Sequence, residues 1–200
     1  KLDRSYFLNR IIVRPDGIVE QKRFVSPEGQ DFAFLYVNLF CFSKDATDYF
    51  ALDAAGNKCA GKFEETWNLQ RDVRYAAIYD AAKETGITIY YPEIIKGAVR
   101  RAAFWNVPKA YKKYYLMAAV PAHCPPGFAS PVYTVILRGF KAAPAAAEGA
   151  AEAAAGEAAA LKFAALPEVK APAPAAAPAA APEAGKTAVT FDTDFTRSRD

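Results

Sequence analysis

Residues 142–184 most constrain what this chain can fold into, because 24 of these 43 residues are Ala and 6 are Pro. Alanine buries little apolar area, and proline interrupts the hydrogen bonding of helices and sheets. This stretch is therefore not expected to build a core of its own. Residues 1–141 contain 24 of the 27 aromatic residues in the 200-residue chain. The sequence predicts a globular domain over 1–141 and an Ala/Pro-rich arm over 142–200.

Several segments of the globular part have the aromatic and β-branched composition of strands. The turn signal Pro15-Asp16-Gly17 separates the first two and predicts a hairpin. A third strand is apolar on both faces, which favours a central position in a sheet. The last strand is expected to pair with this N-terminal sheet. The five expected strands cover residues 7–14, 18–25, 32–43, 49–52 and 131–140.

Helical spacing of apolar residues predicts a helix from about Phe63 to Gly86, with Glu64 and Glu65 in its first turn. Pro92 and Pro108 are placed as first residues of two more helices, which would run to about residues 106 and 120. Residues 87–91 are ambiguous between strand and helix. The expected fold class is α+β, a small and mostly antiparallel sheet with two or three helices, followed by a long extended Ala/Pro-rich C-terminal arm.

The arm divides into a helix over about 145–165, an extended polyproline-like segment over about 167–183 and a short strand-like end over about 187–195. A helix of this length spans about 32 Å. The extended segment adds about 53 Å. That reach exceeds the diameter of the globular part, so an arm held along its length is expected to lie on other subunits. The alternative is a flexible linker.

The formal net charge of +3 hides an asymmetry, with +6 in residues 1–141 and −3 in residues 142–200. Neither value demands a polyanionic partner. Cys41, Cys59 and Cys124 have unrelated spacings, which favours free thiols in a reducing compartment. No window reaches the ~18 consecutive apolar residues of a membrane-spanning helix, so we expect no transmembrane helix.

His123 is the only histidine, and it precedes Cys124. A thiol nucleophile or a metal site could be read from this pair, but the paired Cys spacing of metal sites is absent. The carboxylate pairs Glu64/Glu65 and Asp45/Asp48 suit a helix start and a polar turn. No glycine-rich phosphate loop or nucleophile motif is present in the sequence. We expect no enzyme activity, no catalytic or metal-ligating residue and no bound cofactor.

A run of basic and aromatic residues is the one candidate contact surface. Lysines would fall on one face of the helix expected after Pro108, and tyrosines on the other. Three interpretations compete: an amphipathic helix with a buried aromatic face, an anionic membrane surface, and RNA with bases stacked on aromatic rings. The candidate lipid- or RNA-contacting residues are Arg100, Arg101, Trp105, Lys109, Lys112, Lys113, Tyr114 and Tyr115.

The layout resembles that of supernumerary subunits of mitochondrial inner-membrane complexes. The shared features are a start at Lys1, which favours a processed chain, a small body, the basic aromatic run PKAYKKYYLM and the arm APAPAAAPAAAPE. No single motif carries the resemblance, and it assigns no residue role. It implies a mitochondrial protein, peripheral to the inner membrane, that supports the assembly of a respiratory complex or an ATP synthase.

These observations favour a non-catalytic accessory subunit of an organellar energy-converting membrane complex, which stabilises assembly through its arm. Its partners would be other protein subunits and anionic lipid headgroups, with RNA a less favoured partner. One alternative is an organellar ribosomal protein that binds RNA. Another is a small enzyme or ligand-binding domain with an unidentified site.

Overall fold

The computed structural model describes residues 5–31, 35–64, 66–93, 102–107, 109–118 and 123–166. Over these residues the chain is mostly β, with antiparallel pairing throughout the sheets. The only α-helix in the described ranges comes at their C-terminal end. The expectation of an α+β domain with two or three helices is therefore wrong, and the described part is a β-sandwich-like fold of several sheets.

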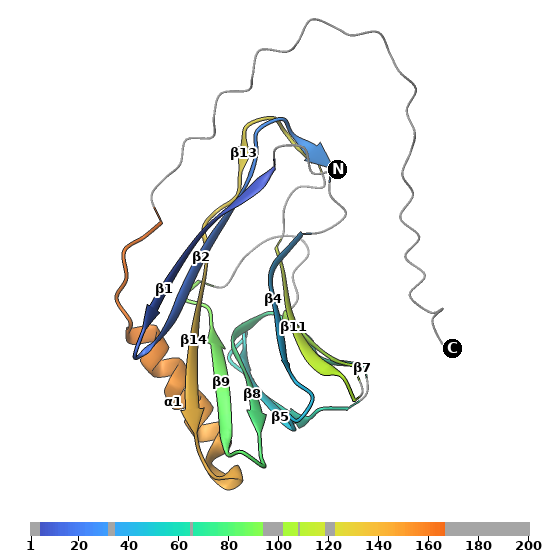
Figure 1. Ribbon diagram of the computed structural model, residues 1–200, viewed down its shortest axis with the longest axis vertical. Coiled ribbons are helices and arrows are strands. Elements are labelled where there is room, and N and C mark those ends of the chain that lie inside the picture. The colour runs from blue at the N-terminus through green and yellow to red at the C-terminus, as the bar shows by residue number, and fades with distance from the viewer. Residues whose placement is uncertain are drawn as a thin grey trace, which may run out of the picture.

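Two sheets form the body (Figure 1). The larger has eight strands. Its main path runs β1 (Tyr6–Arg14), β2 (Gly17–Ser26), β14 (Tyr133–Lys141), β9 (Thr85–Tyr90), β8 (Val73–Asp80), β5 (Asp48–Asp53) and β6 (Lys58–Lys62), with β13 (Phe128–Ala129) also beside β2. The smaller runs β4 (Leu35–Ser43), β11 (Tyr111–Ala118), β10 (Ala102–Val107) and β7 (Thr66–Arg71). A short pair joins β3 (Gln30–Asp31) to β12 (His123–Cys124).

The main core lies between these two sheets. Phe104 and Tyr114 of the smaller sheet pack with Ile78, Ile89 and other buried residues of the larger one. Successive side chains of a strand point to opposite faces, so each strand gives only alternate residues to this core. In β8, for example, Ala76 and Ile78 belong to the core between the sheets. The neighbouring Ala77 and Tyr79 belong to a second cluster on the other face of the larger sheet.

The second face of the larger sheet is covered by a 3₁₀ turn, η1 (Pro144–Ala146), and by α1 (Ala147–Ala160), on the side away from β4 and β11 in Figure 1. The buried side chains of α1 are all alanines, at helical spacing: Ala147, Ala151, Ala154, Ala155 and Ala158. They pack on large residues of the sheet, among them Phe50, Tyr79 and Ile136. Alanine thus builds no core alone, but it lets a helix lie close to aromatic and aliphatic side chains.

Polar contacts fix α1 and its flanks to the same sheet. The buried Thr88 hydroxyl donates to the carbonyl of Ala151 over 3.2 Å. Arg138 forms an ion pair with Glu157 at 2.5 Å, and Lys58 forms one with Glu152 at 2.6 Å. Residues 142–166, the described part of the expected arm, therefore lie on the chain's own body. The expected extended segment at 167–183 and the strand-like end at 187–195 lie outside the described residues.

The hairpin predicted from the first two strands is confirmed, whereas the central position expected for the third strand is wrong, because β4 lies at an edge of the smaller sheet. β1 and β2 form the hairpin around Pro15-Asp16, with Gly17 beginning the second strand at a φ of 150°. The last strand, β14, pairs with β2 as expected. The hairpin follows from local signals, namely its turn residues and β-branched composition. The pairing of β14 with β2 joins segments far apart in the sequence.

The three predicted helices are wrong. The first spans β7 and β8, and the described part of the other two contains strands β10 and β11 and no helix. β8 is buried from Val73 to Asp80 except at Arg74, so it lacks the polar alternation that identifies a strand. Its alanines and Ile78 suit a helical period equally well. Around Pro108 the chain makes a hairpin turn, in which Lys109 takes a φ of 63°.

Candidate interaction surfaces

The β10–β11 hairpin distributes the predicted contact residues over two faces. Trp105, Lys113 and Tyr115 project outward from the smaller sheet, as their mutual ring and cation contacts indicate. Lys112 and Tyr114 project into the space between the sheets. Lys109 is exposed in the turn, and Arg100 and Arg101 lie outside the described residues. The expected arrangement, with lysines on one face and tyrosines on the other, is wrong because a strand alternates its faces at every residue.

Lys112 is a structural cation. It is 6% exposed, and its Nζ donates to the carbonyl of Lys44 over 2.8 Å and to Oδ1 of Asn106 over 3.1 Å. The ammonium also lies 5.3 Å from the ring centroid of Phe63, a favourable cation–π distance. Burial lowers the pKa of this amine. Its geometry leaves it turned away from any lipid or phosphate at the surface.

Tyr114 is fully buried, and its ring centroid lies 5.0 Å from that of Phe104 and 6.4 Å from that of Phe40. Burial raises the pKa of its phenol, and burial likewise raises that of Tyr91. Both phenols stay neutral at ordinary pH. Tyr114 is therefore a core residue of the sandwich.

The outer side of the smaller sheet carries what we call the aromatic face: Trp67, Trp105, Tyr115 and Tyr36. The two indoles stack with ring centroids 5.5 Å apart and an angle of 18° between their planes. Tyr115 lies 5.7 Å from Trp67 and 5.2 Å from Tyr36. The chain has only two tryptophans, and both are in this face. Each strand of the smaller sheet thus contributes one ring to a continuous row.

Part of the aromatic face is open to solvent. Trp67 is 48% exposed and Tyr36 is 37% exposed, while neighbouring Leu39 is 45% exposed. Lys113 borders the face, with its Nζ 5.7 Å from the centroid of Trp105 and 5.1 Å from that of Tyr111. Sequence reasoning picked out Trp105, Lys113 and Tyr115 but not Trp67 or Tyr36. Those two residues join the row through strand pairing that a local pattern does not reveal.

A second surface is the outer edge of the larger sheet. β1 begins the strand order and pairs only with β2 among the described strands. Ile11 is 57% exposed, Val13 is 74% exposed and Phe7 is 40% exposed. These three side chains alternate along one face, on which Phe7 meets Phe24 at a ring distance of 5.4 Å. This surface was not expected, although the segment FLNRIIVR carries a signal of it: a long strand without Lys or Pro in which apolar residues outnumber Arg10 and Arg14.

The opposite face of β1 is occupied. Ile12 packs with Leu161 and Phe163, which follow α1. Arg14 donates to the carbonyl of Lys162 over 2.9 Å, and Arg10 donates to that of Ala165 over 3.3 Å. Both guanidinium groups of β1 thus bind carbonyls of the chain's own C-terminal residues, and Arg14 also pairs with Asp16.

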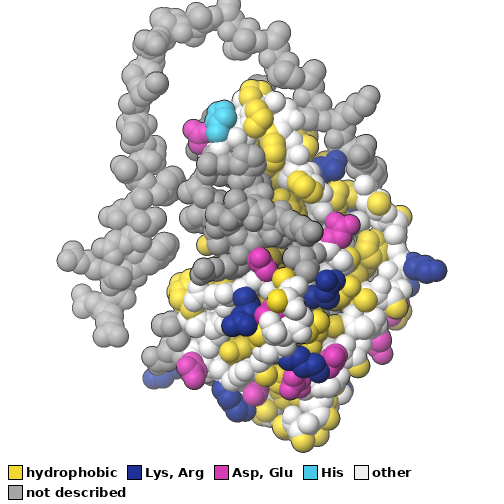
Figure 2. Space-filling view, turned by 180° about the vertical axis from the view of Figure 1, so that it is seen from behind, with side chains coloured by type: hydrophobic (Ala, Val, Ile, Leu, Met, Phe, Trp, Pro, Cys, Tyr) yellow, Lys and Arg dark blue, Asp and Glu magenta, His cyan; other side chains and the backbone are white. Residues whose placement is uncertain are grey.

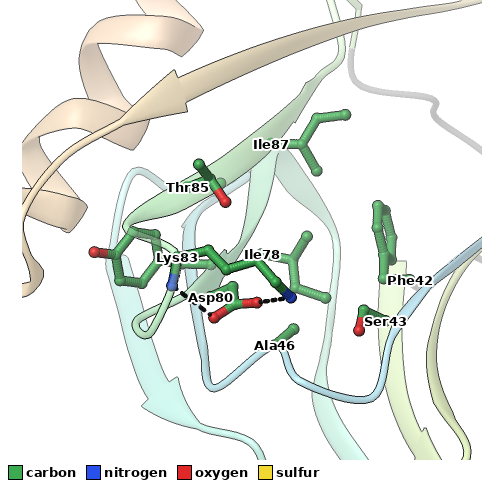
Figure 3. Close-up of a pocket in the computed structure, with 10 residues that line it drawn as sticks. Phe42, Ser43, Ala46, Ile78, Asp80, Lys83, Thr85 and Ile87 are labelled. Atoms are coloured by element: carbon green, nitrogen blue, oxygen red, sulfur yellow. Dashed lines mark hydrogen bonds and ion pairs between the residues drawn. The ribbon is translucent and has the colours of Figure 1, made fainter.

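A shallow pocket of about 300 Å³ lies at one end of the sandwich (Figure 3). Its walls come mainly from Phe42, Ala46, Ile78 and Ile87. Lys83 lies across it, with its Nζ 2.7 Å from Asp80 and 3.4 Å from Asp45. These ion pairs satisfy the charged groups of the pocket. The pocket holds no nucleophile–base pair, and we assign it no chemistry.

The cysteine and histidine residues are not brought together for catalysis. His123 is exposed, and its Nδ1 lies 2.6 Å from Oδ1 of Asp31. Cys124 is buried on the other side of the same short strand, and burial raises the pKa of its thiol. Its neutral form is therefore favoured near neutral pH. In the described part of the chain no three His, Cys, Asp or Glu residues gather as metal ligands would.

Charged side chains are mixed over the surface. On the face seen in Figure 2, Lys and Arg alternate with Asp and Glu across the lower part of the described body, with no broad area of one sign. Such mixing provides no phosphate-tracking stripe for RNA. Within the described residues, no helix combines the length and apolarity that a membrane crossing requires.

Comparison with known proteins returns no relative. No protein-family model matches this chain, and neither does any curated protein or solved structure. Function is therefore inferred from the surfaces of the chain itself.

Proposed function

We propose that this chain is a non-catalytic subunit of a larger protein assembly and that it binds a neighbouring subunit through β1. The observation that carries the proposal is the outer edge of β1, which is nine residues long, has β2 as its one partner among the described strands and exposes Ile11 and Val13. An edge strand with unpaired backbone groups can accept a further strand from another protein.

The expected occupant is an extended segment of a different protein. A second copy of this chain, paired antiparallel about Arg10, would place two guanidinium groups opposite each other, and like charges directly opposite are destabilising. A fitting segment would carry apolar side chains toward Ile11 and Val13 and an acidic side chain toward Arg10. Backbone hydrogen bonds would supply affinity, and the alternating side chains would supply specificity.

The setting we propose is the organellar energy-converting membrane complex to which the sequence layout is similar. Its support is the layout of the sequence, since the structure provides the surface but not the neighbour. The structure gives less support to an RNA-binding role, because Lys112 and Tyr114 are buried. A ligand-binding enzyme also has less support, because the charges of the described pocket are already paired.

The experiment introduces one charge at each edge of the larger sheet. Ile11→Lys adds a cation to the exposed face of β1, and Ala60→Lys adds one to exposed positions of β6. Tagged full-length chains are expressed in the source cells, and their share in the native assembly is measured on native gels. We expect Ile11→Lys to reduce incorporation about tenfold, equivalent to roughly 1.4 kcal/mol. Ala60→Lys should leave it unchanged.

Equal incorporation of the two variants would show that β1 is not the contact. Sedimentation of the purified chain provides the second readout. If the parent chain sediments as a dimer and Ile11→Lys does not, the partner of β1 is a second copy of this chain. That result would overturn the proposal of a foreign strand. Urea denaturation of both variants checks that the added lysine leaves the fold intact.

A further inference from the structure

The aromatic face is not explained by the packing of the sandwich. Its rings lie on the outer side of the smaller sheet, whereas the core residues Phe104 and Tyr114 lie on the inner side. Trp67 and Tyr36 are exposed although they carry large aromatic rings, whereas Tyr115 beside them is buried. Clustered exposed aromatic residues mark binding surfaces in soluble proteins.

The chain itself contains a segment whose chemistry fits this face. Residues 167–183, which lie outside the described residues, include Pro167, Pro172, Pro174, Pro178 and Pro182 among alanines. Proline-rich segments favour the extended polyproline conformation and dock on surfaces lined by Trp and Tyr, because little entropy remains to be lost on binding. The small alanine side chains between the prolines would let the backbone approach the rings.

The reach of the segment is sufficient. The described chain ends beside β1, where Arg10 binds the carbonyl of Ala165. From there residues 167–183 can span about 53 Å in the polyproline conformation. Packed sheets lie about 10 Å apart, so this length suffices to reach the outer side of the smaller sheet. Charge also fits, since Glu168 and Glu183 outnumber Lys170 in the segment and Lys113 borders the face.

We propose that the aromatic face binds the chain's own Ala/Pro segment, residues 167–183. The segment would lie across Trp67 and Trp105, with its carbonyl oxygens accepting hydrogen bonds from the indole N–H groups and Lys113. The contact is made on the smaller sheet, whereas the proposed strand addition is made on β1 of the larger sheet. It would hold the C-terminal residues against the body and cover the exposed indole of Trp67.

Tryptophan fluorescence tests the proposal in the full-length chain, because both tryptophans belong to the aromatic face. One variant replaces Pro172, Pro174, Pro178 and Pro182 with Gly. The matched control replaces four nearby alanines, Ala173, Ala175, Ala177 and Ala181, with Ser. We expect quenching by acrylamide to increase about twofold or more in the proline variant, as an intramolecular contact of high effective concentration is lost. The alanine control should resemble the parent chain.

A synthetic peptide of residues 167–183 gives the converse readout. Added to the proline variant, it should restore the protection of the indoles. It should change nothing in the parent chain, whose face is already covered. The parent's protection should also be independent of protein concentration, and protection that disappears on dilution would overturn the intrachain arrangement in favour of a second copy.

Other outcomes would also overturn the proposal. Identical quenching in the parent chain and the proline variant would mean that the segment does not cover the face. A shift of the parent's emission on adding a soluble glucan, a short single-stranded RNA or anionic vesicles would show that the face is open to another ligand.

Discussion

The larger sheet ends in two unlike edge strands. β6 has five residues, with a lysine at each end, and both lysines are ion-paired: Lys58 with Glu152 and Lys62 with Asp48. β1 has nine residues, without lysine or proline, and exposes Phe7, Ile11 and Val13. The first edge has the short, charged form that discourages pairing with another chain. The second has the long apolar form that invites it.

The contrast shows that exposed apolar side chains are a feature of the β1 edge and are not shared by the β6 edge of the same sheet. The residues that follow β14 contact both edges, through Glu152 at β6 and through the carbonyls of residues 162 and 165 at β1. Among the described residues, those after α1 cover only one face of β1, and no described strand pairs with its outer edge. The charged β6 edge therefore discourages pairing with another chain, whereas the β1 edge favours it.

Displacing α1 is expected to have the largest effect, and it should affect both edges alike. Ala151 is fully buried between the helix and the sheet, so Ala151→Leu overpacks this contact and should lower the free energy of unfolding by about 1–3 kcal/mol. Ala153→Leu, on the exposed side of α1, is the control and should change it little. Urea denaturation measures both. An equal cost for the two variants would contradict the packing of α1 described above.

Removing the protection of β6 should make the two edges alike. The double variant Lys58→Val and Lys62→Val gives β6 the apolar character of β1, and two open edges per chain permit head-to-tail association. We expect self-association at about tenfold lower protein concentration, equivalent to roughly 1.4 kcal/mol. Sedimentation velocity measures it. Lys141→Val, in a strand paired on both sides, should associate no more than the parent chain.

The turn that precedes β6 should make the stability of the fold depend on pH in the acid range. Oδ1 of Asp53 accepts from the backbone N–H groups of Asn57 over 2.8 Å and Ala55 over 3.0 Å. These hydrogen bonds, with that of Asn57 first, hold the pKa of Asp53 below its usual 3.8. The carboxylate therefore stabilises the fold above its unfolded pKa, and this contribution is lost as the pH falls through the lower folded value.

Asp53→Asn tests this pH dependence. Near neutral pH the variant should be less stable than the parent chain in urea. Below about pH 4 the difference between the two should shrink, because protonation removes the parent's advantage as well. A difference that stays constant from neutral pH into the acid range would count against the ionised carboxylate as the cause.

The ion pair between Lys58 and Glu152 should have the smallest effect. Both side chains are more than half exposed, and exposed ion pairs add little to stability because water and salt screen them. Lys58→Ala alone should leave the urea midpoint nearly unchanged at physiological salt. A marked loss of stability would mean that β6 depends on this pair and is not merely protected by its charge.

The parts of the fold that could be predicted are those governed by local chemistry. Pro15-Asp16-Gly17 predicts a turn, and the β-branched residues around it predict two strands. In β8 the same reasoning failed, because burial on both faces removes the polar alternation and Ala76, Ala77 and Ile78 suit either period. The Ala-rich segment was expected to be helical, and α1 is helical at 147–160.

The candidate surfaces were predictable only in part. The basic and aromatic composition around Trp105 and Tyr115 indicated a contact surface. Helical spacing placed Lys112 and Lys113 on the same face, but in a strand these two neighbours point to opposite faces. Trp67 and Tyr36 joined the aromatic face through pairing across the sheet. The position of β1 at an edge depends on which strands pair far along the chain, and no single segment encodes that order.

The five buried alanines of α1 also bear on how this protein can vary. A single base change in an alanine codon gives Val, Thr, Ser, Pro, Gly, Asp or Glu, and most of these are larger, charged or helix-breaking. At Ala151 or Ala158, each fully buried, such replacements would lift the helix from the sheet or break it. The Ala-rich stretch is the most repetitive part of the sequence, yet we expect it to tolerate few substitutions at these five codons. Its solvent-facing alanines and glycines should tolerate more.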